Sequence, residues 1–193
     1  MSSCNKFAVH WIEKWPTGWL PFPALLLYGE RGSGKSHLAE VWRKRAHADF
    51  LSAEEFIALS KDDLLSRTEN MVIDRIDILV GKREQEEKLF HLYNHCQQNR
   101  LFFLALSRVS PENQSFEIKD LASRLRAAPN AEIAAPDDDL LFKVLAKRFH
   151  DQGYIVAEPA LSYAVTRMER SWEALDHLVN DAIKLATAQK KQV

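Results

Sequence analysis

The sequence predicts an α/β fold in which a parallel sheet is covered by helices and is followed by a small all-helical subdomain. Short apolar runs of the buried-strand type alternate with longer amphipathic segments in the first part of the chain. This alternation is typical of a parallel sheet with helical connections. After Pro136 only helical patterns follow, over a stretch too long for one more crossover. We therefore predict a core domain at 1–135 and a helical subdomain at 136–193.

The expected elements follow from apolar patterns and from the residues that interrupt them. Asn5 to about Trp15 forms an amphipathic pattern, which Pro16 and Gly18 end. Apolar runs predict strands at 24–28, 48–51, 70–74, 101–106 and 131–135. Amphipathic patterns predict helices at 36–45, 84–98 and 118–125, and a further helix after the N-cap Ser52. In the helical subdomain we expect helices from Asp137 to Asp151, from Pro159, and from Ser171 to about Gln189.

Composition limits the class of protein. Of the 193 residues, 46% are hydrophobic and 27% are charged, which is an ordinary globular balance. The net charge of −1 gives no overall attraction to nucleic acid or to anionic membranes. Cys4 and Cys96 have no metal-site spacing, no apolar run approaches a membrane span, and the N-terminus lacks a signal-peptide pattern. We therefore expect a cytoplasmic protein without a membrane partner.

The segment between the first strand and its helix has the spacing of a phosphate-binding loop. Gly29, Gly34, Lys35 and Ser36 form G-x-x-x-x-G-K-S. Glycines let the backbone turn tightly, so that successive N–H groups point at a di- or triphosphate. Lys35 would place a positive charge on the β- and γ-phosphates, and the dipole of the following helix would add to it.

This loop predicts that the chain binds ADP or ATP together with Mg²⁺. The Ser36 hydroxyl would complete the coordination shell of the metal ion. The expected cofactor-binding residues in this segment are Gly29, Arg31, Gly32, Ser33, Gly34, Lys35, Ser36 and His37. His37 is included only as a helix residue beside the loop.

The second half of a nucleotide site is expected at the end of the strand at 70–74. Asp74 lies where a P-loop protein places the carboxylate that orients the metal ion. In active ATPases the next residue is commonly a second acid that activates water, whereas here it is Arg75. Asp77 could reach the site only if the end of the strand bends. The sequence therefore predicts nucleotide binding with slow hydrolysis by the chain itself.

Three further segments resemble the DnaA family of AAA+ ATPases. Gln85 to Asn94 (Q-E-E-K-L-F-H-L-Y-N) is similar to an acidic family segment that ends in F-F-H-x-x-N. Leu104 to Arg108 (L-A-L-S-R) falls where the family has the end of its sensor I strand, with Ser107 as the polar residue. Asp120 to Leu125 (D-L-A-S-R-L) resembles the family segment D-L-x-S-R-L/F. The resemblance covers essentially the whole chain.

The resemblance implies an AAA+ P-loop core followed by a helical lid. It also implies that Arg124 is an arginine finger, which acts on a nucleotide bound by a neighbouring subunit. The alternative for Arg124 is a surface arginine that pairs with Asp120 at i, i+4. The short regulatory members of the family give the nearest resemblance.

The chain also departs from the family pattern. The sensor II arginine of the lid aligns with Glu173, and Arg170, about one turn earlier, is the candidate substitute. Ser107 stands where the initiator has Asp. A clamp-binding peptide is not visible in Met1 to Phe7, and no helix-turn-helix follows the lid. We therefore expect no sequence-specific DNA binding, and the sliding clamp is only a possible partner.

These features favour a regulatory AAA+ subunit that stimulates ATP hydrolysis by the DnaA initiator through Arg124, and that possibly forms homo-oligomers. A P-loop nucleoside or metabolite kinase is the alternative, although the sequence shows no basic lid motif for phosphate transfer. A structural adaptor that holds nucleotide only for stability is a third hypothesis.

Overall fold

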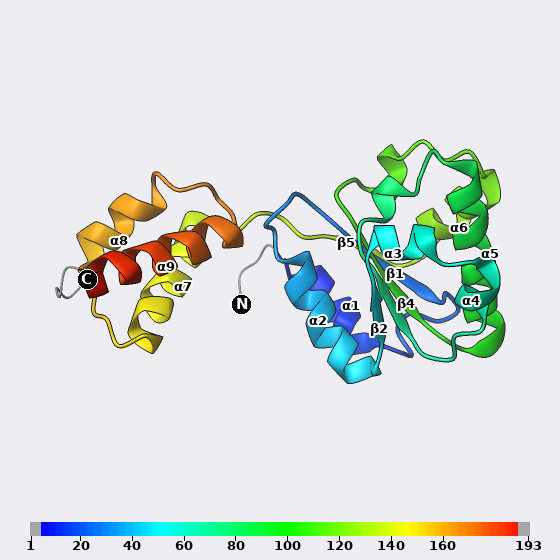
Figure 1. Cartoon of the computed structure of the whole chain (residues 1–193), viewed down its shortest axis with the longest axis horizontal. Coiled ribbons are helices and arrows are strands. Elements are labelled where there is room, and N and C mark those ends of the chain that lie inside the picture. The colour runs from blue at the N-terminus through cyan, green and yellow to red at the C-terminus, as the bar shows by residue number, and fades with distance from the viewer. Residues whose placement is uncertain (1–4, 189–193) are drawn as a thin grey trace. The chain divides into compact units, whose positions relative to one another are not determined.

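The computed structural model of the protein describes residues 5–188, and these form two compact units (Figure 1). The core unit contains Asn5–Glu30 and Lys35–Ile133. The helical unit contains Arg31–Gly34 and the chain from Ala134 onward. Residues 1–4 of the segment examined for a clamp-binding peptide lie outside the described residues.

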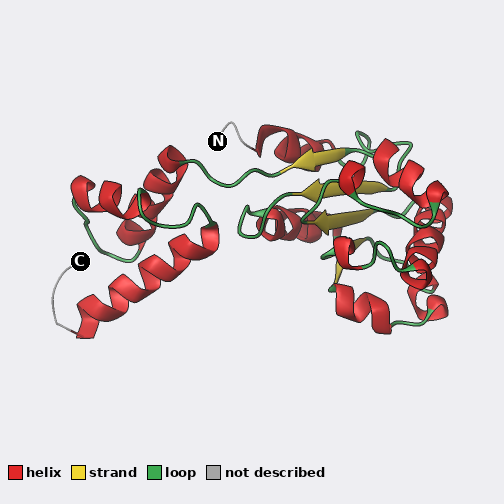
Figure 2. Ribbon diagram, turned by 90° about the horizontal axis from the view of Figure 1, so that it is seen from above, coloured by secondary structure: helices red, strands yellow, loops and turns green. Residues whose placement is uncertain are grey.

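A parallel sheet forms the centre of the core unit (Figure 2). Its strands are β1 (Ala24–Tyr28), β2 (Asp49–Leu51), β3 (Met71–Ile73), β4 (Phe103–Ser107) and β5 (Asn130–Glu132). Within residues 5–188 their order is β2-β3-β4-β1-β5. The register pairs Tyr28 with Ser107 and Ile73 with Ala105. The carboxyl ends of β1, β3 and β4 therefore meet at one edge, which is where open parallel sheets bind ligands.

Helices cover both faces of the sheet. One face packs against α1 (Lys6–Lys14) and α2 (Lys35–Ala46). The other face packs against α3 (Ala53–Ala58), α5 (Arg83–Asn99) and α6 (Lys119–Ala127), with α4 (Lys61–Leu65) beside them. Because successive strand residues point to opposite faces, Leu25 and Leu27 enter the first cluster and Leu26 enters the second. This double burial explains why the strands read as continuous apolar runs.

Polar contacts fix the ends of several core helices. Ser52 Oγ accepts the N–H of Glu55 at 3.1 Å, and the Glu55 carboxylate accepts the N–H of Ser52 at 2.8 Å, so α3 begins with a capping box. Arg45, in the basic last turn of α2, donates to the carbonyls of Ile12 and Trp15 at 3.2 Å each. These bonds satisfy carbonyl groups that the end of α1 leaves without helical partners.

The helical unit contains α7 (Asp138–Asp151), α8 (Glu158–Val165) and α9 (Trp172–Ala188). The Asp137 side chain caps α7 by accepting the N–H of Leu140 at 2.8 Å. A separate apolar core joins the three helices through Leu141, Leu145, Phe149, Leu161, Val165, Leu175 and Val179. In the part of the chain that is described, no helix combines the length and apolar character needed to cross a membrane.

The predicted fold class is confirmed: a parallel, helix-covered sheet precedes an all-helical region. Most strand boundaries lie within one residue of the expectation, and two differ by more. The strand expected at 101–106 runs from Phe103 to Ser107, because Arg100 takes a left-handed conformation that ends α5 just before it. The strand expected at 131–135 ends at Glu132, after which the Ile133 N–H still donates to Tyr28 O at 2.7 Å. The sequence patterns did not indicate α4 or the short 3-10 helices η2 (Ile76–Ile78) and η3 (Pro111–Asn113).

Candidate nucleotide site

The phosphate-binding loop connects β1 to α2, as its sequence context predicts. Lys35 is the first residue of α2 and its side chain folds back over the loop. Its Nζ donates to Gly29 O at 2.6 Å and to Glu30 O at 2.7 Å, and the residue is only 8% exposed. Burial lowers the pKa of Lys35, while the nearby Asp74 acts in the opposite direction. The loop thus fixes a positive charge at the carboxyl end of the sheet.

The tip of the loop, Arg31–Gly34, belongs to the helical unit and contacts the first turn of α9. The backbone N–H of Trp172 donates to Gly32 O at 3.1 Å, and its indole Nε1 donates to Ser33 O at 3.1 Å. Arg31 forms an exposed ion pair of 2.7 Å with Glu173, the residue that aligns with the sensor II arginine. Among the predicted residues of the lid, Glu173 is therefore the one that contacts the loop.

At two positions of the loop tip, both the backbone conformation and the available space require glycine. Gly32 has a φ of +75° and Gly34 a φ of +106°, which side chains rarely adopt. A Cβ at Gly32 would lie 2.6 Å from the Cβ of Ser171, and one at Gly34 would lie 2.9 Å from Trp172 Nε1. Glycine is therefore required at both positions, and the Lys35 side chain and the Ser36 hydroxyl are groups that could hold a nucleotide and its metal ion.

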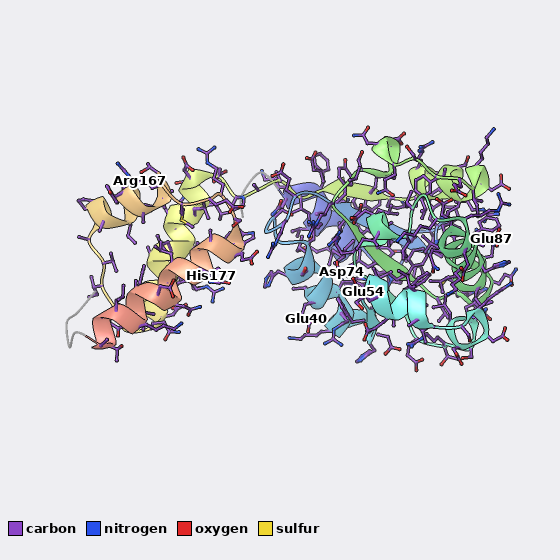
Figure 3. The ribbon with its side chains drawn as sticks, turned by 45° about the horizontal axis from the view of Figure 1, so that its top comes forward. Glu40, Glu54, Asp74, Glu87, Arg167 and His177 are labelled. Carbon is purple, nitrogen blue, oxygen red and sulfur yellow. The ribbon has the colours of Figure 1, made fainter. Side chains whose placement is uncertain are left out.

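Asp74 directly follows β3 in the core unit (Figure 3). Lys35 is among the charged groups that act on its carboxylate. Burial raises the pKa of Asp74, opposed by the backbone N–H of Arg75 and by the charges of Arg75 and Lys35. A carboxylate and a lysine are thus brought together at the edge predicted for the site. Asp74 and Ser36 are the oxygen donors of this chain that would hold Mg²⁺ beside a nucleotide.

Asp77 is tied into a local network beyond Asp74. Its Oδ2 accepts Arg75 Nε at 3.2 Å, and its Oδ1 accepts the backbone N–H of Arg108 at 3.1 Å. The strand end does bend, because Arg75 takes a left-handed conformation and η2 follows. After the bend, the Asp77 carboxylate is therefore bound by the Arg75 guanidinium and by the Arg108 backbone.

Ser107, the expected sensor residue, is fully buried at the end of β4. Its Oγ donates to Val109 O at 2.6 Å and accepts Gln114 Nε2 at 2.8 Å. The hydroxyl therefore helps to fix the turn after β4. The sequence did not indicate Gln114, because nothing in the pattern shows that this residue is buried.

The other predicted residues lie at different places on the surface. Ser36 and His37 are exposed on the first turn of α2. Arg170 forms a bidentate pair with Asp138, at 2.8 Å and 2.9 Å, and is therefore held within the helical unit. The structure thus brings Gly29, Lys35 and Asp74 together, whereas the Arg170 side chain is already engaged with a carboxylate.

Arg124 projects from α6 onto α5 and is half-buried. Its guanidinium carbon lies 5.2 Å from the ring centre of Phe90 and 5.4 Å from that of Tyr93. Its Nη1 also donates to Gln97 Oε1 at 3.3 Å. Among the described residues, no ion pair joins Arg124 to Asp120, so the alternative of an i, i+4 surface pair is not what the structure shows.

Glu86 is a buried carboxylate that the sequence did not single out within its acidic segment. It is fully buried and accepts the N–H groups of Gly81, Glu117 and Ile118, at 2.7, 3.1 and 2.7 Å. Glu86 therefore ties the first turn of α5 to the start of α6, the helix that carries Arg124. No sequence signal separates Glu86 from the exposed Glu87 beside it.

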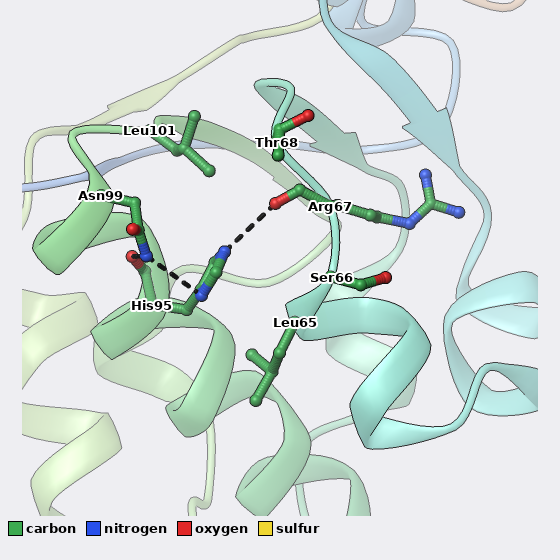
Figure 4. A pocket seen from close by; sticks show the side chains of 7 residues that line it. All are labelled: Leu65, Ser66, Arg67, Thr68, His95, Asn99 and Leu101. Carbon is green, nitrogen blue, oxygen red and sulfur yellow. Dashed lines mark hydrogen bonds between the residues drawn. The ribbon is translucent and has the colours of Figure 1, made fainter.

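A hollow of about 280 Å³ lies elsewhere on the core unit (Figure 4). It is lined by residues 65–68, His95, Asn99 and Leu101. His95 Nε2 lies 3.2 Å from the carbonyl oxygen of Arg67, and Asn99 Nδ2 lies 3.2 Å from His95 Nδ1. None of the predicted nucleotide residues lines this hollow.

Comparison with solved structures agrees with this architecture. Domain III of the replication initiation protein DnaA from Thermotoga maritima has a TM-score of 0.85 and 18% identity, covering 100% of this chain and 88% of that one. AMPPCP-bound DnaA from Aquifex aeolicus has a TM-score of 0.77 and 18% identity, covering 97% and 62%. The RuvB protein of Thermotoga maritima, as the R170A variant, has a TM-score of 0.74 and 17% identity, covering 98% and 63%. These likenesses show the fold, a parallel α/β core followed by a helical region.

Comparison of sequences finds DnaA proteins among the relatives of this chain. DnaA of Flavobacterium psychrophilum is 25% identical over 194 residues, covering 91% of this chain and 41% of the relative. DnaA of Bacteroides thetaiotaomicron is 25% identical over 190 residues, covering 89% and 40%. An uncharacterised protein of Haemophilus influenzae is 26% identical over 168 residues, covering 81% and 73%. No family model matches the chain. The chain is related to DnaA, and it spans about two fifths of the length of these DnaA proteins.

Proposed function

We propose that the chain is a regulatory AAA+ protein of the Hda type, which binds ADP or ATP and stimulates ATP hydrolysis by DnaA. Its effect would be to limit re-initiation of DNA replication. The relationship to DnaA supports the choice of partner, and the phosphate-binding loop supports the nucleotide. One observation carries the proposal: the chain has a complete phosphate-binding loop, yet Arg75 stands where active ATPases have the acid that activates water.

The nucleotide half of the proposal rests on Lys35, Ser36 and Asp74. Lys35 is fixed by two loop carbonyls, and Asp74 lies within its electrostatic reach. Bound Mg²⁺ would neutralise phosphate charge, with Ser36 and Asp74 as its protein donors. The nucleotide would act mainly as a conformational ligand, because no carboxylate directly follows Asp74.

Slow hydrolysis by the chain itself follows from Arg75. A cation cannot take a proton from water, so Arg75 cannot replace a water-activating acid. Asp77, the next acid along the chain, accepts bonds from both Arg75 and Arg108. Both carboxylate oxygens are thereby engaged.

Arg124 supplies the activating half of the proposal. A guanidinium held against two aromatic rings keeps its charge and loses little further conformational freedom when it meets a phosphate. The Gln97 contact, at 3.3 Å on the surface, is weak enough to be exchanged for a phosphate oxygen. An arginine finger supplied in trans accelerates hydrolysis by about 10³- to 10⁵-fold in P-loop proteins.

The test is ATP turnover by purified DnaA with and without this chain, beside turnover by the chain alone. We expect stimulation of DnaA and negligible turnover by the chain alone. Arg124→Ala should abolish stimulation and leave nucleotide affinity unchanged. Arg83→Ala is the matched control, because Arg83 is an exposed arginine on the adjacent helix α5 and pairs only with Glu87 among the described residues. Retained stimulation by Arg124→Ala would refute the proposal.

The remaining partners are tested in the same assay. Stimulation that requires added sliding clamp would make the clamp a partner. A steep dependence of stimulation on the concentration of the chain would indicate a homo-oligomer. Turnover that depends on a small hydroxyl compound, with no effect on DnaA, would instead favour the kinase alternative.

A further inference from the structure

Arg75 has an unusual backbone at the end of β3. Its φ of 57° and ψ of 47° place it in the left-handed region, which is unfavourable for a residue with a long side chain. This turn starts η2 directly after Asp74. Such a conformation persists where the surrounding structure holds it, and it is found preferentially at functional sites.

Among the described residues, the Arg75 guanidinium is bound through its Nε atom alone. Its Nε donates to Asp77 Oδ2 at 3.2 Å, and the Asp77 side chain is 13% exposed and fixed by the Arg108 N–H through its other oxygen. Within residues 5–188, the two terminal nitrogens of Arg75 have no hydrogen-bond partner. Two terminal N–H groups of a guanidinium form the fork that binds two oxygens of one phosphate.

Arg75 also lies among the groups that define the phosphate end of the site. It directly follows Asp74 after β3, and its partner Asp77 accepts the N–H of Arg108 just after β4, so the guanidinium lies at the edge where these strands end. The lysine of such a loop binds the β- and γ-phosphates. A guanidinium at the same edge as Lys35 and Asp74 is therefore placed to reach the terminal phosphate.

We propose that Arg75 is a ligand of the terminal phosphate of bound nucleotide and gives the chain a preference for ATP over ADP. This rests on the nucleotide binding of the proposed function. Asp77 positions the guanidinium by its Nε, and the two terminal nitrogens meet the γ-phosphate oxygens. Arg75 thus replaces the water-activating acid and adds a contact to the γ-phosphate, which ADP lacks.

The experiment measures the affinity of the full chain for fluorescent analogues of ATP and ADP. We expect ATP to bind more tightly than ADP. Arg75→Gln should weaken ATP binding by about tenfold, as for loss of a charged hydrogen bond, and should change ADP affinity by less than about threefold. Arg75→Lys should restore part of the ATP affinity, because it keeps the charge and loses the fork. Melting temperatures without nucleotide report whether each variant is folded.

Arg100→Gln is the matched control. Arg100 is exposed, and its φ of 56° makes it left-handed as well. It ends α5 on the core unit, so its replacement should leave both affinities unchanged. If Arg75→Gln weakens both nucleotides equally, or leaves ATP affinity within about twofold, Arg75 does not contact the terminal phosphate. If the unsubstituted chain binds neither nucleotide, the nucleotide half of the proposed function fails as well.

Discussion

Replacement of Glu86 by glutamine tests how the core unit fixes the helix that carries Arg124. The Glu86 carboxylate is fully buried and accepts two N–H groups at Oε1, from Gly81 and Glu117, and one at Oε2, from Ile118. Glutamine keeps the shape of the side chain but offers only one acceptor oxygen. Its amino group must then face an N–H donor.

The size of the effect follows from this count. If the amide oxygen takes the place of Oε1, the Ile118 N–H is left buried without an acceptor, which costs about 1–3 kcal/mol. The other two bonds lose their charge-assisted character, at about 1 kcal/mol each. An amide is easier to bury than a carboxylate, which offsets part of the loss. We therefore expect Glu86→Gln to lower the free energy of unfolding by about 2–4 kcal/mol.

Urea denaturation followed by tryptophan fluorescence measures this loss. Trp11, Trp15, Trp19 and Trp42 lie in the core unit, whereas Trp172 lies in the helical unit, so the signal reports mainly on the core. The unfolding midpoint should fall by about 1–2 M urea. Glu87→Gln is the matched control, because Glu87 is exposed and pairs with Arg83 on the surface. Midpoints of the two variants within about 0.3 M of each other would show that the Glu86 carboxylate does not hold the start of α6.

Two further predictions concern titratable groups. Burial raises the pKa of Asp74, so its ionised form opposes folding at neutral pH, and this effect disappears as the pH falls below the ordinary carboxyl pKa of about 4. Asp74→Asn should therefore raise the melting temperature of the nucleotide-free chain at pH 7, and this gain should disappear toward pH 4. An equal gain at pH 7 and pH 4 would contradict a raised pKa of Asp74. Burial also raises the pKa of Cys96 to about 12. In a Cys4→Ser background, Cys96 should not react with a thiol reagent at pH 8 until urea unfolds the core, and rapid labelling of the native protein would refute its burial.

The sequence predicted the elements with strong local signals. The signals for the loop, for the apolar runs of β1 and β3 and for the N-cap at Ser52 each depend on neighbours close in sequence. The strand order and register depend on contacts between distant residues, and a single sequence shows no sign of these. The end of β5 was misplaced because Ile133 is apolar and buried although it lies outside the strand.

Side-chain roles in the candidate site were harder to predict. The residue types of Glu86 and Glu87 are identical, and only the fold buries one of them. The contact of Arg124 with Phe90 and Tyr93 joins two helices that are separated in sequence. The left-handed backbone of Arg75 has no signature in residue type, since such positions favour glycine or asparagine. Sequence identified Arg75 as a departure from the pattern, and the structure shows its partners.

The strand order has a consequence for synthesis of the chain. β1 lies between β4 and β5, so the strand that leads into the phosphate-binding loop has no sheet partner until residues 103–107 have left the ribosome. A nascent chain that stops before Phe103 exposes both edges of an entirely apolar stretch, Ala24–Leu27, and such edges promote aggregation. Fragments that end between β3 and β4 should therefore need a chaperone or be degraded, whereas those that extend past β5 contain every partner of β1.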